Sequence, residues 1–300
     1  MPVTGAQYEI AGHGHRAVVT GVGAGLRVLT ADGFALVETY DADESPPMGA
    51  GGVLVPWPNR VAGARFAWRG REYHPEVTEP ARGNAIHGVL RRVTWEPVAH
   101  TDDAVTLAAE VAAGPGWPEP LHVETTWSVG ADGLTATHAV TNTGSGDVPV
   151  GLGVHPYLRV GDAPVADCVL TVPTEQVLDV DDARIPVGAP RAVTAGEDLS
   201  TGRRVGDLDL DTCFRLRPHP GEVHLDLRAP DGSGTRLRAD ASFPWAQVFT
   251  PASPFAPGAT AVAVEPMTCP PDALNSGTDL AVVAAGETWT VRWGLERLAP

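Results

Sequence analysis

Apolar and polar residues alternate with a period of two through most of the chain. In the stretch LHVETTWSV, residues 121–129, apolar side chains fall on alternate positions. The alternation resumes at residues 134–139, after the turn Ala131-Asp132-Gly133. Alternation on both sides of a short turn predicts a β-hairpin with one buried face.

The same pattern recurs along the chain. It predicts three more hairpins, at residues 65–74, 95–111 and 224–237, and a last strand at residues 289–295. The 34 glycines and 28 prolines supply turns and discourage long helices, so the best helical candidate is the short segment 280–285. No internal repeat or low-complexity linker divides the chain. We therefore expect an all-β fold, a single domain over residues 1–300 that forms a large antiparallel β-sandwich.

Charge, lysine and cysteine content limit the possible partners, the possible chemistry and the expected cellular compartment. The formal net charge of −16 argues against nucleic acid and anionic membrane surfaces. The chain contains no lysine, so Schiff-base chemistry on lysine and a Walker phosphate loop are excluded. Three cysteines far apart in sequence predict reduced thiols in a cytoplasmic protein. The N-terminus has no signal-peptide pattern, and no apolar run approaches the roughly 18 residues needed to span a bilayer.

The segment AVAVEPMTCPPDALNSG, residues 261–277, places Glu265 at the end of an apolar run and directly before Pro266. Because three prolines stiffen this segment, we expect Glu265 at a strand end, followed by an irregular loop that is neither helix nor central strand. A carboxylate in apolar surroundings needs partners or a task, and a rigidly held one suits a general base. An ordinary strand-end glutamate facing water would show the same pattern.

A second segment, Pro56-Trp57-Pro58-Asn59-Arg60, has the composition of a sugar-binding loop. The prolines make it rigid, Trp57 offers an aromatic face to a sugar ring, and Asn59 and Arg60 offer donors to its hydroxyl groups. A surface turn with an exposed arginine would also fit this sequence.

Three further stretches place polar residues where a plain β protein would not. The motif Asn-x-x-His-Gly at residues 84–88 presents His87 beside a glycine, which gives the backbone freedom. Residues 151–157 follow an apolar strand and end in His155-Pro156-Tyr157, and Asp211 directly precedes a new strand. Each stretch alone is also compatible with a structural role.

These motifs occur in one order over most of the chain, and in that order the sequence resembles the aldose 1-epimerase (mutarotase) family. The resemblance runs from about residue 51 to residue 277 and ends with the pattern Glu-Pro-x-x-x-x-Pro-Asp-Ala that begins at Glu265. It implies the large twisted β-sandwich of that family, the galactose mutarotase-like supersandwich. It also implies an isomerase that interconverts the anomers of a hexose with no metal or organic cofactor.

The resemblance implies roles for individual residues as well. Glu265 matches the catalytic base, His155 the general acid, and His87 a second histidine that contacts the sugar. Ordinary pKa values leave glutamate ionised and allow histidine to carry a proton near neutrality. The substrate-binding candidates are Asn59, Arg60, Asp211, Gln247 and, from the loop composition, Trp57. The expected partner is a monosaccharide, bound by a monomer or homodimer.

Two departures from the galactose-type members concern the substrate. The Pro-Trp-Pro before Asn-Arg and the Met-Thr-Cys-Pro-Pro after the glutamate-proline resemble a divergent bacterial subgroup, some of whose members act on sulfoquinovose, a sulfonated glucose. An anionic sugar of this kind needs a cation, and arginine forks match tetrahedral oxyanions well. Candidates for that contact are Arg60, Arg82, Arg91 and Arg92.

Three other classes of protein share part of the pattern. A glycoside hydrolase would use Asp211 and Glu265 as paired carboxylates. A metal enzyme could use His87, His155 and Glu265 as a two-histidine, one-carboxylate ligand set. A non-catalytic sugar-binding protein would keep the aromatic and arginine contacts but need neither acid nor base.

Overall fold

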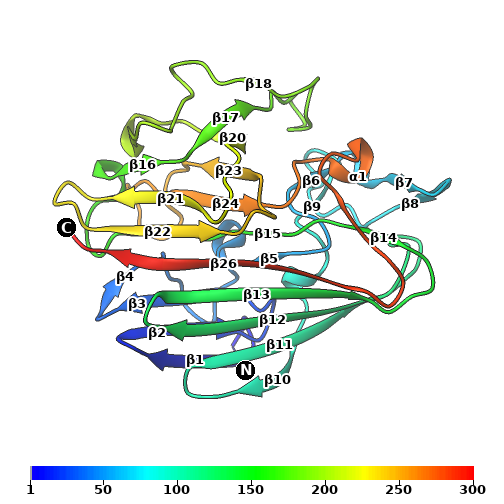
Figure 1. Cartoon of the computed structure of the whole chain (residues 1–300), viewed down its shortest axis with the longest axis horizontal. Helices are drawn as coiled ribbons and strands as arrows, with labels where there is room; N and C mark the ends of the chain where they lie inside the picture. The colour runs from blue at the N-terminus through cyan, green and yellow to red at the C-terminus, as the bar shows by residue number, and fades with distance from the viewer. Residues whose placement is uncertain (1) are drawn as a thin grey trace.

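The computed structural model describes residues 2–300, which consist mainly of β-strands and connecting loops (Figure 1). The strands form sheets of nine, seven and four strands and three two-stranded sheets, and every recorded strand pairing is antiparallel. This arrangement confirms the all-β, antiparallel fold that the period-two pattern predicts.

The nine-stranded sheet contains the clearest predicted hairpins. In order across the sheet its strands are β10 (Glu96–His100), β11 (Ala104–Val111), β12 (Leu121–Gly130), β13 (Gly133–Asn142), β26 (Thr288–Leu298), β22 (Gly234–Ala239), β21 (Val223–Arg228), β16 (Val169–Thr171) and β19 (Arg203–Arg204). The last strand of the chain, β26, lies between β13 and β22. It therefore joins the hairpin β12–β13 to the hairpin β21–β22 in one sheet.

The seven-stranded sheet brings distant parts of the chain together. Its order is β18 (Arg191–Ala192), β17 (Thr174–Val177), β20 (Asp211–Leu216), β23 (Trp245–Phe249), β24 (Ala263–Met267), β15 (Gly153–Val154) and β5 (Val53–Leu54). β15 pairs with β5 on one side and with β24 on the other. Residues near positions 55, 155 and 265 therefore lie side by side.

The smaller elements complete the fold. The four-stranded sheet consists of β1 (Gln7–Gly12), β2 (His15–Thr20), β3 (Leu26–Ala31) and β4 (Phe34–Ala35), and the two-stranded sheets pair β6 (Arg60–Val61) with β9 (Ala85–Ile86), β7 (Phe66–Trp68) with β8 (Arg71–Tyr73), and β14 (Val148–Val150) with β25 (Ala281–Val283). Five 3-10 turns are η1 (Pro47–Gly49), η2 (Ala62–Ala64), η3 (Leu90–Arg92), η4 (Val165–Asp167) and η5 (Val205–Asp207). No helix among residues 2–300 has both the length and the apolar character needed to cross a bilayer.

The helix expected at residues 280–285 is wrong. Residues 281–283 form β25 and pair with β14, and the one α-helix among the described residues is α1 (Ala273–Ser276). Two consecutive β-branched residues, Val282 and Val283, favour the strand. The short helix ends at Gly277, whose φ of 72° provides the left-handed conformation common after a helix C-terminus.

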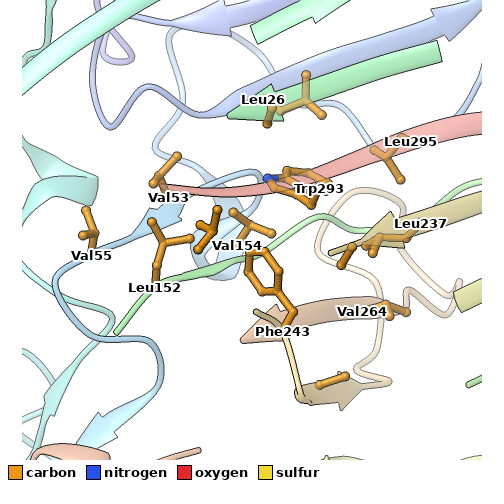
Figure 2. Packing of buried hydrophobic residues seen from close by; sticks show 14 of the residues in the cluster. Leu26, Val53, Val55, Leu152, Val154, Leu237, Phe243, Val264, Trp293 and Leu295 are labelled. Carbon is orange, nitrogen blue, oxygen red and sulfur yellow. The ribbon is translucent and has the colours of Figure 1, made fainter. Parts of the chain in front are cut away.

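The main core lies between the large sheet and the strands that face it. Figure 2 shows Trp293 and Leu295 of β26 and Leu237 of β22 close to Val154 of β15 and Val264 of β24. All five side chains are at most 2% exposed. Burial of alternate side chains from two facing sheets is what the period-two pattern requires of a sandwich.

One histidine lies inside this core. His138 of β13 is fully buried, and Trp293 Nε1 donates a hydrogen bond to its Nε2 at 2.9 Å. The other ring nitrogen, Nδ1, lies 2.9 Å from Thr125 Oγ1, so Nδ1 carries the proton and donates it. Burial lowers the pKa of His138 to about 3, which keeps the ring neutral.

Candidate active site

The structure brings seven of the eight predicted site residues together around one cavity of about 440 Å³, a volume typical of small-molecule sites. The seven are Asn59, Arg60, His87, His155, Asp211, Gln247 and Glu265. They come from the seven-stranded sheet, from β6 and from the loops beside these elements. Convergence from separate parts of the chain is common in binding sites but rare for unrelated surface residues.

Glu265 lies inside β24 and not at a strand end, so the expectation of an irregular loop directly after it is wrong. Its strand pairs with β23 on one side, with Gln247 opposite Glu265 and Ala246 opposite Pro266. Proline is tolerated here because Val264 and Thr268 donate their backbone N–H groups to the segment 152–156 on the other side. The backbone nitrogen of Pro266 is directed to this same side of the strand, where β24 forms only one residue pair with β15. The N–H that proline lacks therefore does not interrupt the hydrogen bonds between β24 and β23.

His155 contacts Glu265 directly. Its Nε2 lies 3.3 Å from Glu265 Oε1, and the two side chains are 5% and 3% exposed. The other carboxylate oxygen, Oε2, is buried and has no hydrogen-bond partner among the described residues. The imidazole stacks on Tyr157 with ring centroids 5.2 Å apart. The pair is thus held in place, with Oε1 as the carboxylate oxygen that contacts the imidazole.

His87 is fixed by reciprocal contacts with Asn59. The backbone N–H of Asn59 donates to His87 Nδ1 at 3.2 Å, and the backbone N–H of His87 donates to the carbonyl of Asn59 at 2.8 Å. Because Nδ1 accepts, the proton of the neutral ring lies on Nε2. The ring packs edge-on against His155 with centroids 5.4 Å apart. His87 can therefore donate a hydrogen bond into the cavity.

The glycine after His87 is required by packing. Gly88 has a φ of 64°, and a Cβ added to it would lie 2.1 Å from the carbonyl oxygen of Val55. No side chain fits such a contact, and the left-handed backbone conformation already favours glycine. The motif His-Gly thus sets the position of the imidazole.

A chain of amide and carboxylate groups lines the cavity beside Glu265. Asn59 Nδ2 donates to Gln247 Oε1 at 3.3 Å, and Gln247 Nε2 donates to Asp211 Oδ1 at 2.7 Å. The strand register places these groups, since Gln247 of β23 lies opposite Glu265 and Asp211 starts the neighbouring β20. A row of fixed donors and acceptors of this kind suits a ligand with several hydroxyl groups.

Arg60 is held by a carboxylate that the sequence analysis did not identify. Glu79 accepts hydrogen bonds from Arg60 Nε at 2.8 Å and from Nη2 at 3.0 Å, and both side chains are largely buried. Burial acts to raise the pKa of Glu79, but hydrogen bonds from Arg60, Arg82 and Asn84 and the charge of Arg60 lower it overall. The need of a buried arginine for a carboxylate is the signal that could have pointed to Glu79.

Trp57 is the predicted site residue that does not line this cavity. Its indole is 3% exposed and stacks on Trp117 with centroids 5.7 Å apart, so the expected sugar-facing surface is covered. The aromatic residue on the cavity wall is Phe249, at the end of β23, which is half-buried. The sequence predicts a large aromatic side chain in this loop but not the direction in which it points. Trp57 points into the protein because its ring packs against another aromatic ring, that of Trp117.

Burial shifts the pKa values of the central pair toward a neutral state. Burial raises the pKa of Glu265 well above its usual range, and the charge of Asp211 adds to this against the opposing charge of Arg60. Burial lowers the pKa of His155 to about 4, and the charge of Arg91 contributes. Both shifts favour the neutral forms, a protonated Glu265 and an unprotonated His155, whereas ordinary pKa values leave glutamate ionised and allow histidine to carry a proton.

His87 is shifted in the same direction as His155. Burial is the main cause of its lowered pKa, followed by His155 and the charges of Arg91, Arg60 and Arg92. Both imidazoles are thus neutral near pH 7.

The same three residues also have the composition of a metal site. Ligating atoms of His87, His155 and Glu265 lie within 4.8 Å of one another. Arg60 and Arg91 line the same cavity, and their positive charge opposes binding of a divalent cation.

Fold and site together define a β-sandwich protein with a buried histidine–glutamate pair at the wall of a polar cavity. A family model for aldose 1-epimerase matches residues 7–296, and the chain belongs to the aldose 1-epimerase family.

Two relatives from other organisms are similar in sequence. The chain is 31% identical to the uncharacterised protein YihR of Escherichia coli K12 over 288 residues, which cover 96% of this chain and 92% of YihR. It is 30% identical to galactose mutarotase of Rattus norvegicus over 163 residues, or 52% of this chain and 45% of that protein.

Solved structures show the same fold. A galactose mutarotase-like protein from Clostridium acetobutylicum superimposes with a TM-score of 0.84 at 17% identity, covering 97% of this chain and 95% of the other. A homologue of the GalM/aldose epimerase from C. elegans gives a TM-score of 0.82 at 22% identity, covering 98% and 99%. The expected galactose mutarotase-like sandwich is thereby confirmed.

Proposed function

We propose that the protein is a mutarotase that interconverts the α and β anomers of a hexose by opening and reclosing the sugar ring. The observation that carries this proposal is the 3.3 Å contact between His155 Nε2 and Glu265 Oε1 at the wall of a polar cavity. Family membership supports the reaction class.

The reaction requires two proton transfers. One proton leaves the anomeric hydroxyl O1 while another reaches the ring oxygen O5, the C1–O5 bond breaks, and the aldehyde recloses on its other face after rotation about C1–C2. In the proposed mechanism the Glu265 carboxylate takes the proton from O1 and the His155 imidazolium gives one to O5. Positioned acid–base groups of this kind contribute roughly 10²–10⁴-fold in rate.

A neutral His155–Glu265 pair is compatible with this scheme. Glu265 protonated with His155 neutral, and Glu265 ionised with His155 protonated, contain the same number of protons. Transfer of one proton across the 3.3 Å contact converts the first form into the second. A ligand hydroxyl group that donates a hydrogen bond to the carboxylate favours the ionised form.

The other cavity residues hold the sugar. Asp211, Gln247 and Asn59 present a connected row of acceptors and donors to the hydroxyl groups. His87 donates through Nε2, and Arg60 is kept in place by Glu79. These groups fix the ring so that C1 and O5 meet the acid–base pair.

Polarimetry on freshly dissolved α-glucose and α-galactose tests the proposal. We expect the rotation to reach its equilibrium value faster with enzyme than without, in proportion to enzyme concentration and unchanged by a chelator. A rate equal to the spontaneous rate for every sugar tried contradicts the proposal and favours a sugar-binding protein. Release of product from glycosides would instead identify a hydrolase that uses Asp211 and Glu265.

A second candidate substrate is an anionic sugar such as sulfoquinovose, and one observation favours it. Arg91 and Arg92 line the catalytic cavity and have no carboxylate partner within ion-pair distance among residues 2–300. Burial and the charge of Arg92 lower the pKa of Arg91 to about 10, so an anion there would relieve an unfavourable charge. By contrast, Arg60 and Arg82 are already paired with Glu79.

The kcat/KM values for sulfoquinovose and glucose at two salt concentrations distinguish these substrates. A preference for the sulfonate that disappears in Arg91→Ala supports the anionic sugar. Equal or better activity on the neutral hexoses rejects it.

A further inference from the structure

Tyr157, the last residue of the His155-Pro156-Tyr157 motif, has no role in the proposed reaction. It is buried and does not line the catalytic cavity. Its ring instead stacks on the imidazole of His155, with ring centroids 5.2 Å apart and the two planes at 26°. The tyrosine therefore contacts the proposed acid without contacting the space in which the sugar would bind.

The register of one antiparallel ladder explains this contact. β15 pairs with β24 at Gly153, and the same register is found four residues further on, in the bridge between Tyr157 and Ala263. His155 and Glu265 lie opposite each other between these two pairs. Opposite residues of an antiparallel pair, and residues two apart in an extended segment, point to the same face. The ladder thus places the base, the acid and the ring that packs on the acid on one face.

The phenol ring is itself fixed by packing. It meets Phe255 edge-on, with centroids 5.0 Å apart. It belongs to a buried cluster whose other members are Tyr40, Ala50, Ala261 and Ala263. Close packing of this kind leaves a side chain little freedom to move. A ring held on several sides therefore restricts the imidazole that stacks on it.

The ring of Tyr157, and not its hydroxyl group, makes the contact with His155. Tyr157 Oη is buried and has no hydrogen-bond partner among residues 2–300. Burial raises the pKa of the phenol, and the charges of Glu265 and Asp211 raise it further, so the phenol keeps its proton near neutrality. A phenylalanine at this position would keep the contact.

We propose that Tyr157 is a positioning residue that acts through His155, because its ring holds the imidazole in the orientation that delivers a proton to O5. This role rests on the proposed mutarotase function. An acid that is free to rotate spends less time in the reactive orientation, and a misplacement of about 1 Å costs about 100-fold in rate. Other groups hold the sugar, so loss of the ring should lower kcat and leave binding nearly unchanged.

Substitutions of Tyr157 test this role. In Tyr157→Leu we expect kcat for glucose to fall by at least about tenfold, while the dissociation constant of glucose changes by less than about threefold. Tyr157→Phe removes only the hydroxyl group, so it should keep kcat within about twofold of wild type. Tyr157→Met fills the space with a flexible chain and should lose kcat as Tyr157→Leu does, which preserves the test if the leucine variant does not fold.

Tyr73→Leu is the matched control. Tyr73 is also buried, and it stacks on Phe66 with centroids 5.4 Å apart and planes at 22°, but it does not line the catalytic cavity. Both leucine variants should have a lower free energy of unfolding, since each loses a buried ring. Only Tyr157→Leu should lose kcat. An equal loss of kcat in both variants overturns the positioning role.

Crystal structures of Tyr157→Phe and Tyr157→Leu provide a readout that needs no turnover. We expect the 3.3 Å contact between His155 Nε2 and Glu265 Oε1 to persist in Tyr157→Phe, and the imidazole to take more than one orientation in Tyr157→Leu. One unchanged orientation in Tyr157→Leu, an unchanged kcat in that variant, or an equally low kcat in Tyr157→Phe overturns the proposal. If the wild type turns over no sugar, the mutarotase proposal fails, and the two crystal structures alone decide whether Tyr157 orients His155.

Discussion

The side chains of Glu265 and His155 lie 3.3 Å apart, and replacing the Glu265 carboxylate tests whether it is the base. Glu265→Gln keeps the size of the side chain and one acceptor but cannot take a proton from O1. We expect kcat to fall by at least about 100-fold while the dissociation constant of the sugar changes only a few-fold. Polarimetry and calorimetry on the folded variant measure both. Retention of more than about 5% of the wild-type rate means that another group is the base.

The pH dependence of kcat/KM reports the proton count of the same pair. Below the pKa of His155, about 4, the pair binds a second proton and no base remains, so activity should fall as the pH decreases. Activity should also fall at high pH, as the last proton leaves with the raised pKa of Glu265. His155→Asn should lower the rate and flatten the limb at high pH, because the acid that loses its proton there is gone, while protonation of Glu265 still lowers activity at low pH. A profile that is the same without His155 reassigns the acid to His87.

The sequence predicted which residues form the site better than it predicted the neighbours and orientation of their side chains. Polar residues in conspicuous motifs, together with the resemblance to the aldose 1-epimerase family, predicted eight site residues, and seven of them line one cavity. Glu79 and Phe249 were missed and Trp57 was misplaced, because the direction of a side chain depends on distant neighbours. The pKa shifts of Glu265 and His155 were missed for the same reason, since they follow from burial.

At the scale of elements, the loop between β9 and η3 depends on a single glycine. Gly88→Ala adds a Cβ at 2.1 Å from the carbonyl oxygen of Val55 and strains a φ of 64°. We expect it to lower the free energy of unfolding by more than about 3 kcal/mol, from left-handed strain plus a forced backbone shift, and to displace His87.

Gly70→Ala is the matched control for this effect. Gly70 has a φ of 79°, and an added Cβ would meet no atom within 4 Å. Strain alone should then lower the free energy of unfolding by about 1 kcal/mol, with activity retained. Denaturant unfolding of both variants makes the comparison. Equal losses of stability in the two variants would contradict the packing argument.

Strands with strict alternation were predicted with nearly correct ends, whereas irregular elements were not. β12 and β13 agree because one buried face sets both their periodicity and their register. β24 was cut short at Glu265 because proline is usually excluded from central strands. Its tolerance of Pro266 depends on which neighbour the missing N–H faces, and that follows only from the assembled sheet.

At the scale of the whole molecule, the buried His138 makes the free energy of unfolding depend on pH. Its folded pKa of about 3 lies below the ordinary value of 6.5, so the folded state binds fewer protons than the unfolded chain at acidic pH. Its contribution to stability is therefore complete above pH 6.5 and is lost as the pH falls toward 3. The limiting slope is about 1.4 kcal/mol per pH unit.

His138→Gln isolates this contribution from the other titrating groups. The difference in unfolding free energy between wild type and variant should shrink as the pH falls from 6.5, with both proteins measured by denaturant titration. A difference that stays constant over this range means that His138 does not titrate on unfolding.

The class of fold could be predicted from the sequence, but its sheet order could not. Period two and frequent turns predict an antiparallel sandwich, and the nine- and seven-stranded sheets confirm it. The insertion of β26 between β13 and β22 joins residues more than 50 positions apart. Such long-range pairings depend on the packing of the complete core, so no local sequence pattern predicts them.

The central claim is that this cavity exchanges anomers, and exchange NMR at chemical equilibrium tests it most directly. With glucose already equilibrated, magnetisation transferred between the α and β anomeric protons reports enzymatic interconversion without net reaction. The account predicts transfer that rises with wild-type enzyme concentration and falls at least about 100-fold with Glu265→Gln at equal sugar occupancy. Transfer by wild type that does not exceed the enzyme-free sample for glucose, galactose or sulfoquinovose would contradict it.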